Sequence, residues 1–254
     1  MKQLLIYEQP TPLNRTSHRE MRLDAVPGDF RFASEVNSIP LTGAEFARAA
    51  RHYPIVFAGN SPDEVVPAAL LGLRDRQNLM VDAEGRWEAD TYVPAFLRRY
   101  PFVLAEVPGS DTPDYTVCLD VGYPWLKEGG EAGERLFDED GKDSPLLQNA
   151  MAFLQEYQVH LARTREFTRR LAKLGLLIPR HVQVEPAQGV AYALEGFFVV
   201  DEEKLRELKG RGLHELLRSG DLGWTYVHLM SLSNVELLSR RQDKSALTAT
   251  SGAH

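Results

Sequence analysis

The chain has almost no cysteine and no long hydrophobic run. Its single cysteine, Cys118, lies in the apolar segment YTVCLDV, which excludes an internal disulfide and a cysteine-rich zinc site. No stretch approaches the roughly 20 apolar residues of a membrane-spanning helix, and MKQLLIYEQP has too few for a signal-peptide core. We therefore expect a soluble protein with no secretion leader, cytoplasmic by default, with leaderless export left open.

Excess positive charge is also missing, because the formal net charge is −7. A nucleic-acid binder needs a basic face to neutralise phosphates, so this class is disfavoured. Basic runs do occur at Arg98-Arg99 and between Arg163 and Lys173. We interpret them as solvated helix faces.

Local motifs for catalysis and cofactor binding are absent as well. The sequence contains no G-x-S-x-G nucleophile elbow, no phosphate-binding G-x-x-x-x-G-K-[ST] loop and no G-x-G-x-x-G. None of its seven histidines has H-x-H or H-E-x-x-H spacing. We accordingly expect no metal and no cofactor, although distant residues can still assemble an acid–base site.

Two segments share one pattern, in which an amphipathic helix ends at Tyr-Pro and an apolar strand follows. They are AEFARAARHYPIVFA at 44–58 and YVPAFLRRYPFVL at 92–104. Proline excludes the preceding residue from the α region, so the helices should end there. Thr42 and Glu45 have the spacing of a capping box at the first helix.

The rest of the first half favours an α+β fold with a largely antiparallel sheet and short helices. We expect strands at 3–7, 20–25, 30–33, 55–57, 67–74, 102–107 and 115–121, a hairpin at 78–88, and an exposed acidic loop at 127–143. Pro10 and Pro12 should interrupt regular structure.

A long helix should begin at Ser144-Pro145 and end before Gly175. Beyond it we expect strands at 176–184 and 190–200, helices at 202–209, 213–218 and 222–241, and a disordered tail. The predicted organisation is an N-terminal subdomain at 1–143, a second part at 144–241 with the long helix and the C-terminal helices, and the tail at 242–254.

The strongest candidate surface is the one where Arg98, Arg99 and Tyr100 would meet Trp87 and Asp82. One interpretation is structural: cations at a helix C-terminus, with a salt bridge to Asp82, Glu84 or Glu88. The other is a clamp for a carboxylate or peptide terminus, with Trp87 or Tyr92 as an aromatic platform. Trp125 is a second exposed-aromatic candidate for partner binding.

Several segments together resemble the SapC family of bacterial proteins. They are LNRTSHREMRL with His18, EFARAARHYPIVFAG, ALLGLRDRQNLMVDAEGRWEADTYVPAFLRRYPFVLAE, FFVVDEEKLREL and GDLGWTYVHLMSLSNVELLSRR. The resemblance covers residues 1 to about 241. The family name comes from a gene associated with surface-layer assembly, and the resemblance carries over no catalytic residue.

Our leading hypothesis is a non-enzymatic binding or accessory protein that acts on a protein or peptide partner. One alternative is an enzyme with a site between the two halves that uses His18, Arg98 or Arg99. Another is a structural component of a surface layer. The ligand, the oligomeric state and the pathway stay open at this point.

Overall fold

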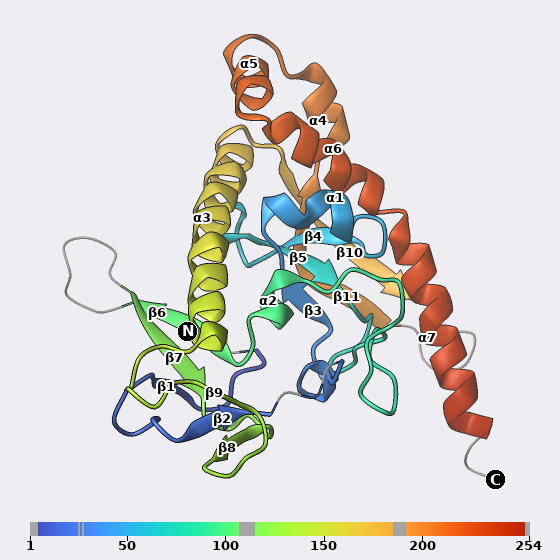
Figure 1. Ribbon diagram of the computed structural model, residues 1–254. Coiled ribbons are helices and arrows are strands. Elements are labelled where there is room, and N and C mark those ends of the chain that lie inside the picture. Colours follow the sequence, from blue (N-terminus) through green and yellow to red (C-terminus); the bar gives the residue numbers. More distant parts are fainter. Residues whose placement is uncertain (1–4, 25, 27, 107–114, 185–191, 252–254) are drawn as a thin grey trace.

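The structure is a computed structural model that describes residues 5–24, 26, 28–106, 115–184 and 192–251 (Figure 1). Within these residues the strands form three sheets, and every strand pair is antiparallel. Helices accompany the sheets along the whole chain. The predicted α+β class with a largely antiparallel sheet is therefore confirmed.

A five-stranded sheet lies at the centre, in the order β10-β11-β4-β5-β3. Its strands are β3 (Ser38–Pro40), β4 (Ile55–Ala58), β5 (Val66–Leu70), β10 (Leu177–Val184) and β11 (Tyr192–Val200). Ile55, Val56 and Phe57 are all buried, as expected for a short apolar strand that is covered on both faces. The sheet combines strands that precede and follow the long helix in the chain.

Two smaller sheets have three strands each. The first, in the order β1-β7-β6, joins β1 (Pro10–Pro12), β7 (Tyr115–Asp120) and β6 (Phe102–Glu106). The second, in the order β8-β2-β9, joins β8 (Leu126–Glu128), β2 (Met21–Leu23) and β9 (Glu134–Arg135). These sheets gather segments before and after α2 at one end of the molecule (Figure 1).

The long helix α3 (Pro145–Lys173) runs along one side of the central sheet (Figure 1). It begins where the sequence predicts: Ser144 Oγ accepts a hydrogen bond from the N–H of Leu147, and Pro145 occupies the first turn. Two single-turn helices, α1 (Phe46–Ala49) and α2 (Ala95–Arg98), precede the Tyr-Pro junctions. The capping box of Thr42 and Glu45 is present at the 3-10 turn Gly43–Glu45.

Four helices complete the chain: α4 (Glu202–Glu207), α5 (Gly210–Ser219), α6 (Asp221–Ser231) and α7 (Asn234–Ser251). Asp201 caps α4 by accepting the N–H groups of Glu203 and Lys204. α5 lies at the top end of the molecule, and α6 and α7 descend along the side opposite α3 (Figure 1).

The described residues contain two hydrophobic clusters. The larger one joins side chains that precede α3 in the chain with side chains of α3 and of the segments after it. It includes Phe46, Ile55, Phe57, Phe167, Leu171 and Leu216, all at most 2% exposed. A smaller cluster joins the start of α3 to the two smaller sheets and includes Leu119, Leu136, Phe137 and Leu147. The predicted division into subdomains at residue 144 stays a prediction. The larger cluster contains side chains from both sides of that position.

Two strand predictions near the N-terminus are wrong. Of the predicted strand 3–7, residues 3 and 4 lie outside the described residues, residues 5 and 6 form a turn and residue 7 is in no strand, while the edge strand β1 contains Pro10 and Pro12. An edge strand tolerates prolines, because their missing N–H groups would face away from the neighbouring strand. Residues 31–33 form a 3-10 turn, since the Asp29 carboxylate accepts the N–H of Arg31 (3.1 Å) and bends the chain.

Two predictions in later segments also need correction. The acidic loop 127–143 is partly ordered, because β8 and β9 lie within or beside it and pair with β2. The single helix predicted at 222–241 is two helices that meet at residues 232–233. Asn234 fixes the break by donating to the carbonyl oxygens of Ala50 (2.7 Å) and Tyr53 (3.1 Å). α7 continues to Ser251, into the segment predicted as a tail.

Candidate functional site

The tandem arginines at the end of α2 line two different cavities. Successive helical residues point about 100° apart, so Arg98 and Arg99 leave the helix in different directions. Arg98 lines a cavity of about 300 Å³ beside Glu45, and Arg99 lines one of about 340 Å³ beside β6. Tyr157 of α3 lines both cavities, so its ring contributes to the wall between them.

The Arg99 cavity is enclosed by α3, α2, β5 and β6. Its apolar wall includes Val66, Phe96, Val103, Leu104 and Leu161. Gln158, Thr164, Arg165 and Thr168 of α3 add polar groups to the lining. An apolar hollow with a few convergent polar groups is the usual form of a ligand site.

Arg99 is held in this cavity by aromatic rings. Its guanidinium carbon lies 4.1 Å from the ring centroid of Phe96, 4.8 Å from that of Tyr157 and 5.6 Å from that of Tyr7. Stacking of this kind fixes the plane of a guanidinium, and Arg99 also forms a side-chain hydrogen bond with Tyr7.

No carboxylate forms an ion pair with Arg99 among the described residues, and its buried Nε has no hydrogen-bond partner among them. Removing a charged group from water without an ionic partner costs free energy that ring contacts offset only in part. An anion that enters the cavity would recover that cost. The site therefore has the electrostatics of an anion receptor.

The neighbouring phenols do not supply this anion. Burial raises the pKa of Tyr7 to about 12, although the nearby Arg99 opposes the shift. Burial likewise raises the pKa of Tyr157 well above its usual range, again against the pull of Arg99. Both phenols are therefore neutral at physiological pH.

Each cavity has a carboxylate in its lining, Glu106 in the Arg99 cavity and Glu45 in the Arg98 cavity. Glu45 is 5% exposed, and its two oxygens accept hydrogen bonds from the N–H groups of Thr42 (2.8 Å) and Ala95 (2.7 Å) and from the hydroxyls of Thr42 and Tyr92. Arg98 donates to the Tyr92 hydroxyl (3.2 Å) and to the carbonyl of Val93 (3.1 Å). Glu45 and Arg98 therefore have hydrogen-bond partners within the fold.

The other predicted site residues are not part of the lining of the Arg99 cavity. Trp87 packs on Phe30, with 5.3 Å between ring centroids, and Tyr100 stacks on Phe32 at 4.4 Å. The Trp125 indole N–H donates to Asp29 (2.8 Å). His18 is buried in a turn, where its Nδ1 accepts the N–H of Asn14 (2.9 Å).

The predicted salt bridges of Arg98 and Arg99 do not form. Asp82 and Glu84 pair with Arg86 at 2.8 and 3.0 Å, and Glu88 pairs with Arg241 at 3.1 Å. The hairpin turn explains the first two pairs, since it places Arg86 within four residues of both carboxylates. Trp87 therefore provides no platform for Arg99; Phe96 and Tyr157 do.

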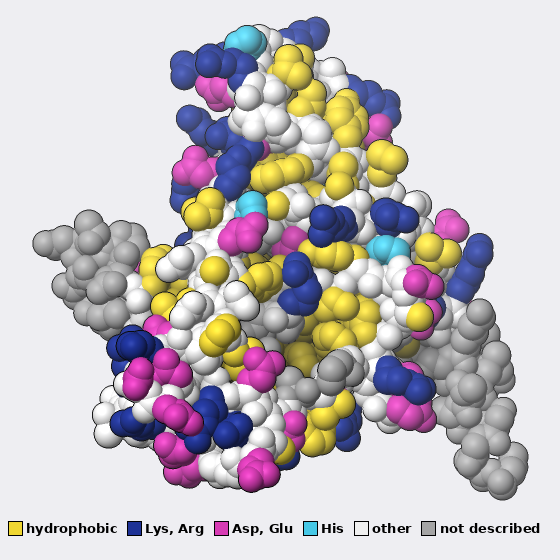
Figure 2. All heavy atoms as spheres, in the orientation of Figure 1, with side chains coloured by type: hydrophobic (Ala, Val, Ile, Leu, Met, Phe, Trp, Pro, Cys, Tyr) yellow, Lys and Arg dark blue, Asp and Glu magenta, His cyan; other side chains and the backbone are white. Residues whose placement is uncertain are grey.

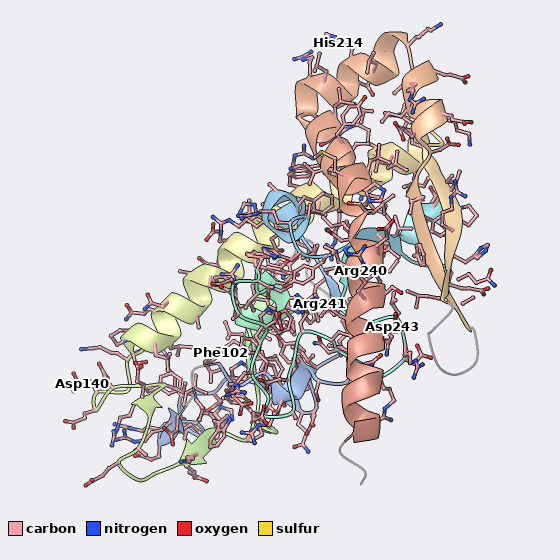
Figure 3. All side chains as sticks on the ribbon, turned by 90° about the vertical axis from the view of Figure 1, so that its right-hand side faces the viewer. Phe102, Asp140, His214, Arg240, Arg241 and Asp243 are labelled. Atoms are coloured by element: carbon pink, nitrogen blue, oxygen red, sulfur yellow. The ribbon has the colours of Figure 1, made fainter. Side chains whose placement is uncertain are left out.

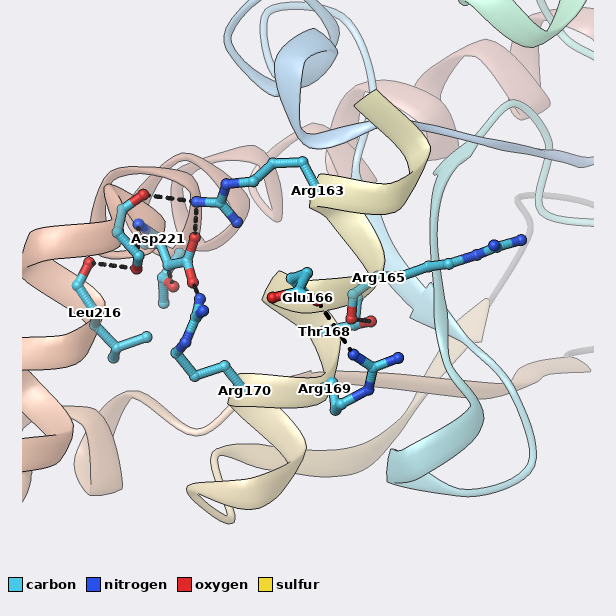
Figure 4. Close-up of polar contacts among 10 residues, drawn as sticks. Arg163, Arg165, Glu166, Thr168, Arg169, Arg170, Leu216 and Asp221 are labelled. Atoms are coloured by element: carbon cyan, nitrogen blue, oxygen red, sulfur yellow. Dashed lines mark hydrogen bonds and ion pairs between the residues drawn. The ribbon is translucent and has the colours of Figure 1, made fainter. Parts of the chain in front are cut away.

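A second arginine site lies where α3 meets the start of α6 (Figure 4). Asp221 is fully buried and forms ion pairs with both Arg163 and Arg170. Arg163 also donates to the carbonyl of Ser219 (2.6 Å). Figure 4 shows these two arginines pointing to one side of α3, whereas Arg165 points to the other, the side of the Arg99 cavity.

His228 is a buried histidine with both ring nitrogens in use. Its Nδ1–H donates to the carbonyl of Ile55 (2.8 Å), and its Nε2 accepts the N–H of Val200 (3.1 Å). Burial lowers its pKa to about 4, although the bond to Ile55 opposes the shift. The ring therefore links β4, β11 and α6 in its neutral form.

Sequence reasoning overlooked the aromatic residues around Arg99. Phe96 and Arg99 are three residues apart, a spacing that places them on one face of a helix, so this pair was readable from the sequence. Tyr7 and Tyr157 come from distant segments, and only the tertiary fold brings them to Arg99. Asp221 was likewise interpreted only as part of the start of the last predicted helix.

The described residues contain neither a metal-binding group nor a membrane-spanning helix. Across the residues that the structure describes, no group of three or more histidine, cysteine, aspartate or glutamate side chains is arranged to hold a metal ion. Across the same residues, no helix is long and apolar enough to cross a membrane.

Comparisons with known proteins identify the family. The comparison with curated proteins and the comparison with solved structures found no match. A family model with the description SapC matches residues 13–238, which is most of the chain and includes every side chain of both arginine sites except Tyr7. This protein belongs to the SapC family.

Proposed function

We propose that this SapC-family protein is a non-enzymatic binding protein whose Arg99 cavity receives a carboxylate of a protein or peptide partner. The observation that carries the proposal is a guanidinium fixed between Phe96 and Tyr157 with no carboxylate partner among the described residues. A carboxylate meets two N–H groups of such a guanidinium at once. The apolar wall beside it suits the hydrocarbon part of the same side chain or terminal residue.

The hypothesis of an enzyme between the two halves has no comparable support. His18 lines neither arginine cavity, and its Nδ1 is occupied by the Asn14 N–H. The carboxylate of Glu45 already accepts four hydrogen bonds. The groups around Arg99 thus favour binding over proton transfer.

Equilibrium dialysis tests the proposal with a pool of acetylated random tetrapeptides. One pool has a free C-terminal carboxylate and the other a C-terminal amide, and retained peptides are measured by mass spectrometry. We expect the carboxylate pool to be enriched, and Arg99→Met to weaken retention at least tenfold, since a charge-assisted bidentate pair contributes about 1.5–3 kcal/mol.

The matched control is Arg98→Met, which removes the neighbouring arginine from the other cavity. Its retention of peptides should equal that of the wild type. Equal retention of the carboxylate and amide pools, or equal losses in the two variants, would contradict the proposal.

A further inference from the structure

The top end of the molecule carries the excess of positive charge that the chain as a whole lacks. Residues 163–173 contain five arginines and lysines and one glutamate, and residues 209–219 contain three and one. We define the cationic apex as Arg169, Arg170, Lys173, Lys209, Arg211 and Arg218. Figure 2 shows dark blue side chains gathered around this end, over α5 and the end of α3.

Half of the cationic apex is left without internal neutralisation. Arg170 pairs with Asp221, Arg211 pairs with Glu215 (2.8 Å) and Arg169 pairs weakly with Glu166 (3.5 Å). Among the described residues, Lys173, Lys209 and Arg218 form no ion pair. The apex therefore keeps a positive field that reaches solvent.

The charges converge on one open hollow. A depression of about 650 Å³ is lined by Arg170, Arg211, His214 and Arg218, together with Glu215 and Ser219. The pKa of Glu215 is lowered, first by its hydrogen bond to Arg211 and also by the charges of Lys173 and Arg170. One carboxylate thus faces cations from both α5 and α3.

Two exposed leucines lie on another face of the same helix, α5. Leu213 is 37% exposed and Leu217 is 63% exposed, and their spacing of four places them on one face of α5. Leu216 of the same helix is fully buried and anchors α5 to the core. α5 lies at the outermost part of the top end in Figure 1, and its residue His214 is labelled at the same end in Figure 3.

Apolar side chains flanked by lysines and arginines on an exposed helix match an anionic lipid surface. The leucines gain by leaving water, and the cations gain from the negative potential of the phosphates. We propose that the cationic apex docks on a membrane surface rich in anionic phospholipid, with Leu213 and Leu217 entering the interface and Lys209, Arg211 and Arg218 facing the phosphates. The protein then binds its partner at a membrane surface without spanning it.

Cosedimentation of the full chain with vesicles tests this docking. The vesicles contain phosphatidylcholine alone or mixed with phosphatidylglycerol. Binding should require phosphatidylglycerol and weaken at high salt, since screening reduces the attraction. Arg218→Glu and Leu217→Asp should each lower the partition coefficient about tenfold, because each lysine or arginine near such a surface contributes about 1 kcal/mol and a buried leucine somewhat more.

Two surface variants outside the cationic apex serve as matched controls. Met230→Asp replaces an apolar side chain that is 74% exposed on α6, and Arg240→Glu reverses an exposed charge on α7. Both should bind vesicles as the wild type does. Circular dichroism should give the same melting temperature for all four variants, because the altered side chains are exposed.

Three results would overturn the proposal. The first is equal binding to vesicles with and without phosphatidylglycerol, and the second is equal losses in the apex and control variants. The third is binding that 10 mM glycerol phosphate abolishes and Leu217→Asp leaves unchanged, because the hollow would then hold a free phosphate compound and not a membrane surface.

Discussion

The two arginine sites differ in how the positive charge of the guanidinium groups is balanced. Where α3 meets α6, Arg163 and Arg170 converge on the fully buried carboxylate of Asp221. Beside α2, Arg99 is equally well fixed, by Phe96, Tyr157 and Tyr7, but no carboxylate among the described residues forms an ion pair with it, although Glu106 lines the same cavity. In the first arrangement the positive charges have an anionic partner within the fold, although the buried Nη1 of Arg163 has no hydrogen-bond partner among the described residues. Under the proposed function, the second receives its anion from a partner, which is the difference between a structural and a binding arginine.

The largest effect should follow from removing the anionic partner with Asp221→Asn. The substitution leaves two partly buried guanidinium groups without an anion, and losing one partner of a buried ion pair costs several kcal/mol. Because Arg163 and Arg170 are 35% and 25% exposed, solvent offsets part of this cost. We expect the free energy of unfolding in urea to fall by about 3 kcal/mol.

The matched control for this variant is Glu166→Gln on the same helix. Its carboxylate is 59% exposed and pairs with an exposed Arg169, so the loss should stay below about 0.5 kcal/mol. If Asp221→Asn costs no more than this control, the Asp221 cluster does not stabilise the fold and the contrast fails.

His228 is another buried group whose hydrogen-bonding partners all lie within the fold. Its contribution to stability depends on pH. Its pKa is about 4 in the folded protein and about 6.5 in an unfolded chain, so the folded state binds the proton less readily. This contribution is fully present above pH 6.5 and is lost as the pH falls towards 4, on the order of 3 kcal/mol in total. Urea unfolding between pH 7.5 and 4.5 should show the loss.

The corresponding control is His228→Gln, which removes the titrating ring. The variant should be less stable at pH 7.5, since the Ile55 carbonyl and the Val200 N–H lose their partner. Its stability should fall less steeply between pH 6.5 and 4.5 than that of the wild type. Parallel slopes for the two proteins would show that His228 is not the responsible group.

A smaller effect should come from placing an additional carboxylate in the Arg99 cavity by substitution. Gln158 lines the Arg99 cavity, and Gln158→Glu supplies a carboxylate of nearly the same size. The new anion should compete with a partner's carboxylate and reduce retention of the tetrapeptide pool about tenfold, with little change in the urea midpoint. Retention equal to that of the wild type would show that the pool binds elsewhere.

The sequence predicts the local parts of this architecture well and the long-range parts poorly. The start of α3 at Ser144-Pro145, the capping box at Thr42 and the strand at 55–58 follow from neighbouring residues, and each is present. The break before α7 was missed because Asn234 bonds to carbonyls about 180 residues away. The strand predicted at 30–33 is wrong, because a side-chain turn at Asp29 outweighs the alternating pattern.

The candidate site shows the same limit. The expected salt bridges of the tandem arginines are wrong, whereas the expected platform Tyr92 does lie beside Arg98, whose guanidinium carbon is 5.8 Å from the ring centroid of Tyr92. Asp82, Glu84 and Glu88 are near in sequence and pair with Arg86 and Arg241. Tyr7 and Tyr157, far from Arg99 in sequence, share its cavity. Periodicity identifies helix faces, but it cannot show which distant segment will pack on them.

The most direct test of the account is the melting temperature of wild type and Arg99→Met, each with and without the carboxylate tetrapeptide pool. Without peptide, the account predicts that Arg99→Met melts at the same temperature as the wild type or higher, because the variant removes a charge without an ionic partner. With peptide, only the wild type should gain, since a ligand stabilises the state it binds. A variant that melts several degrees lower and responds equally to peptide would contradict the claim that Arg99 is kept for an external anion.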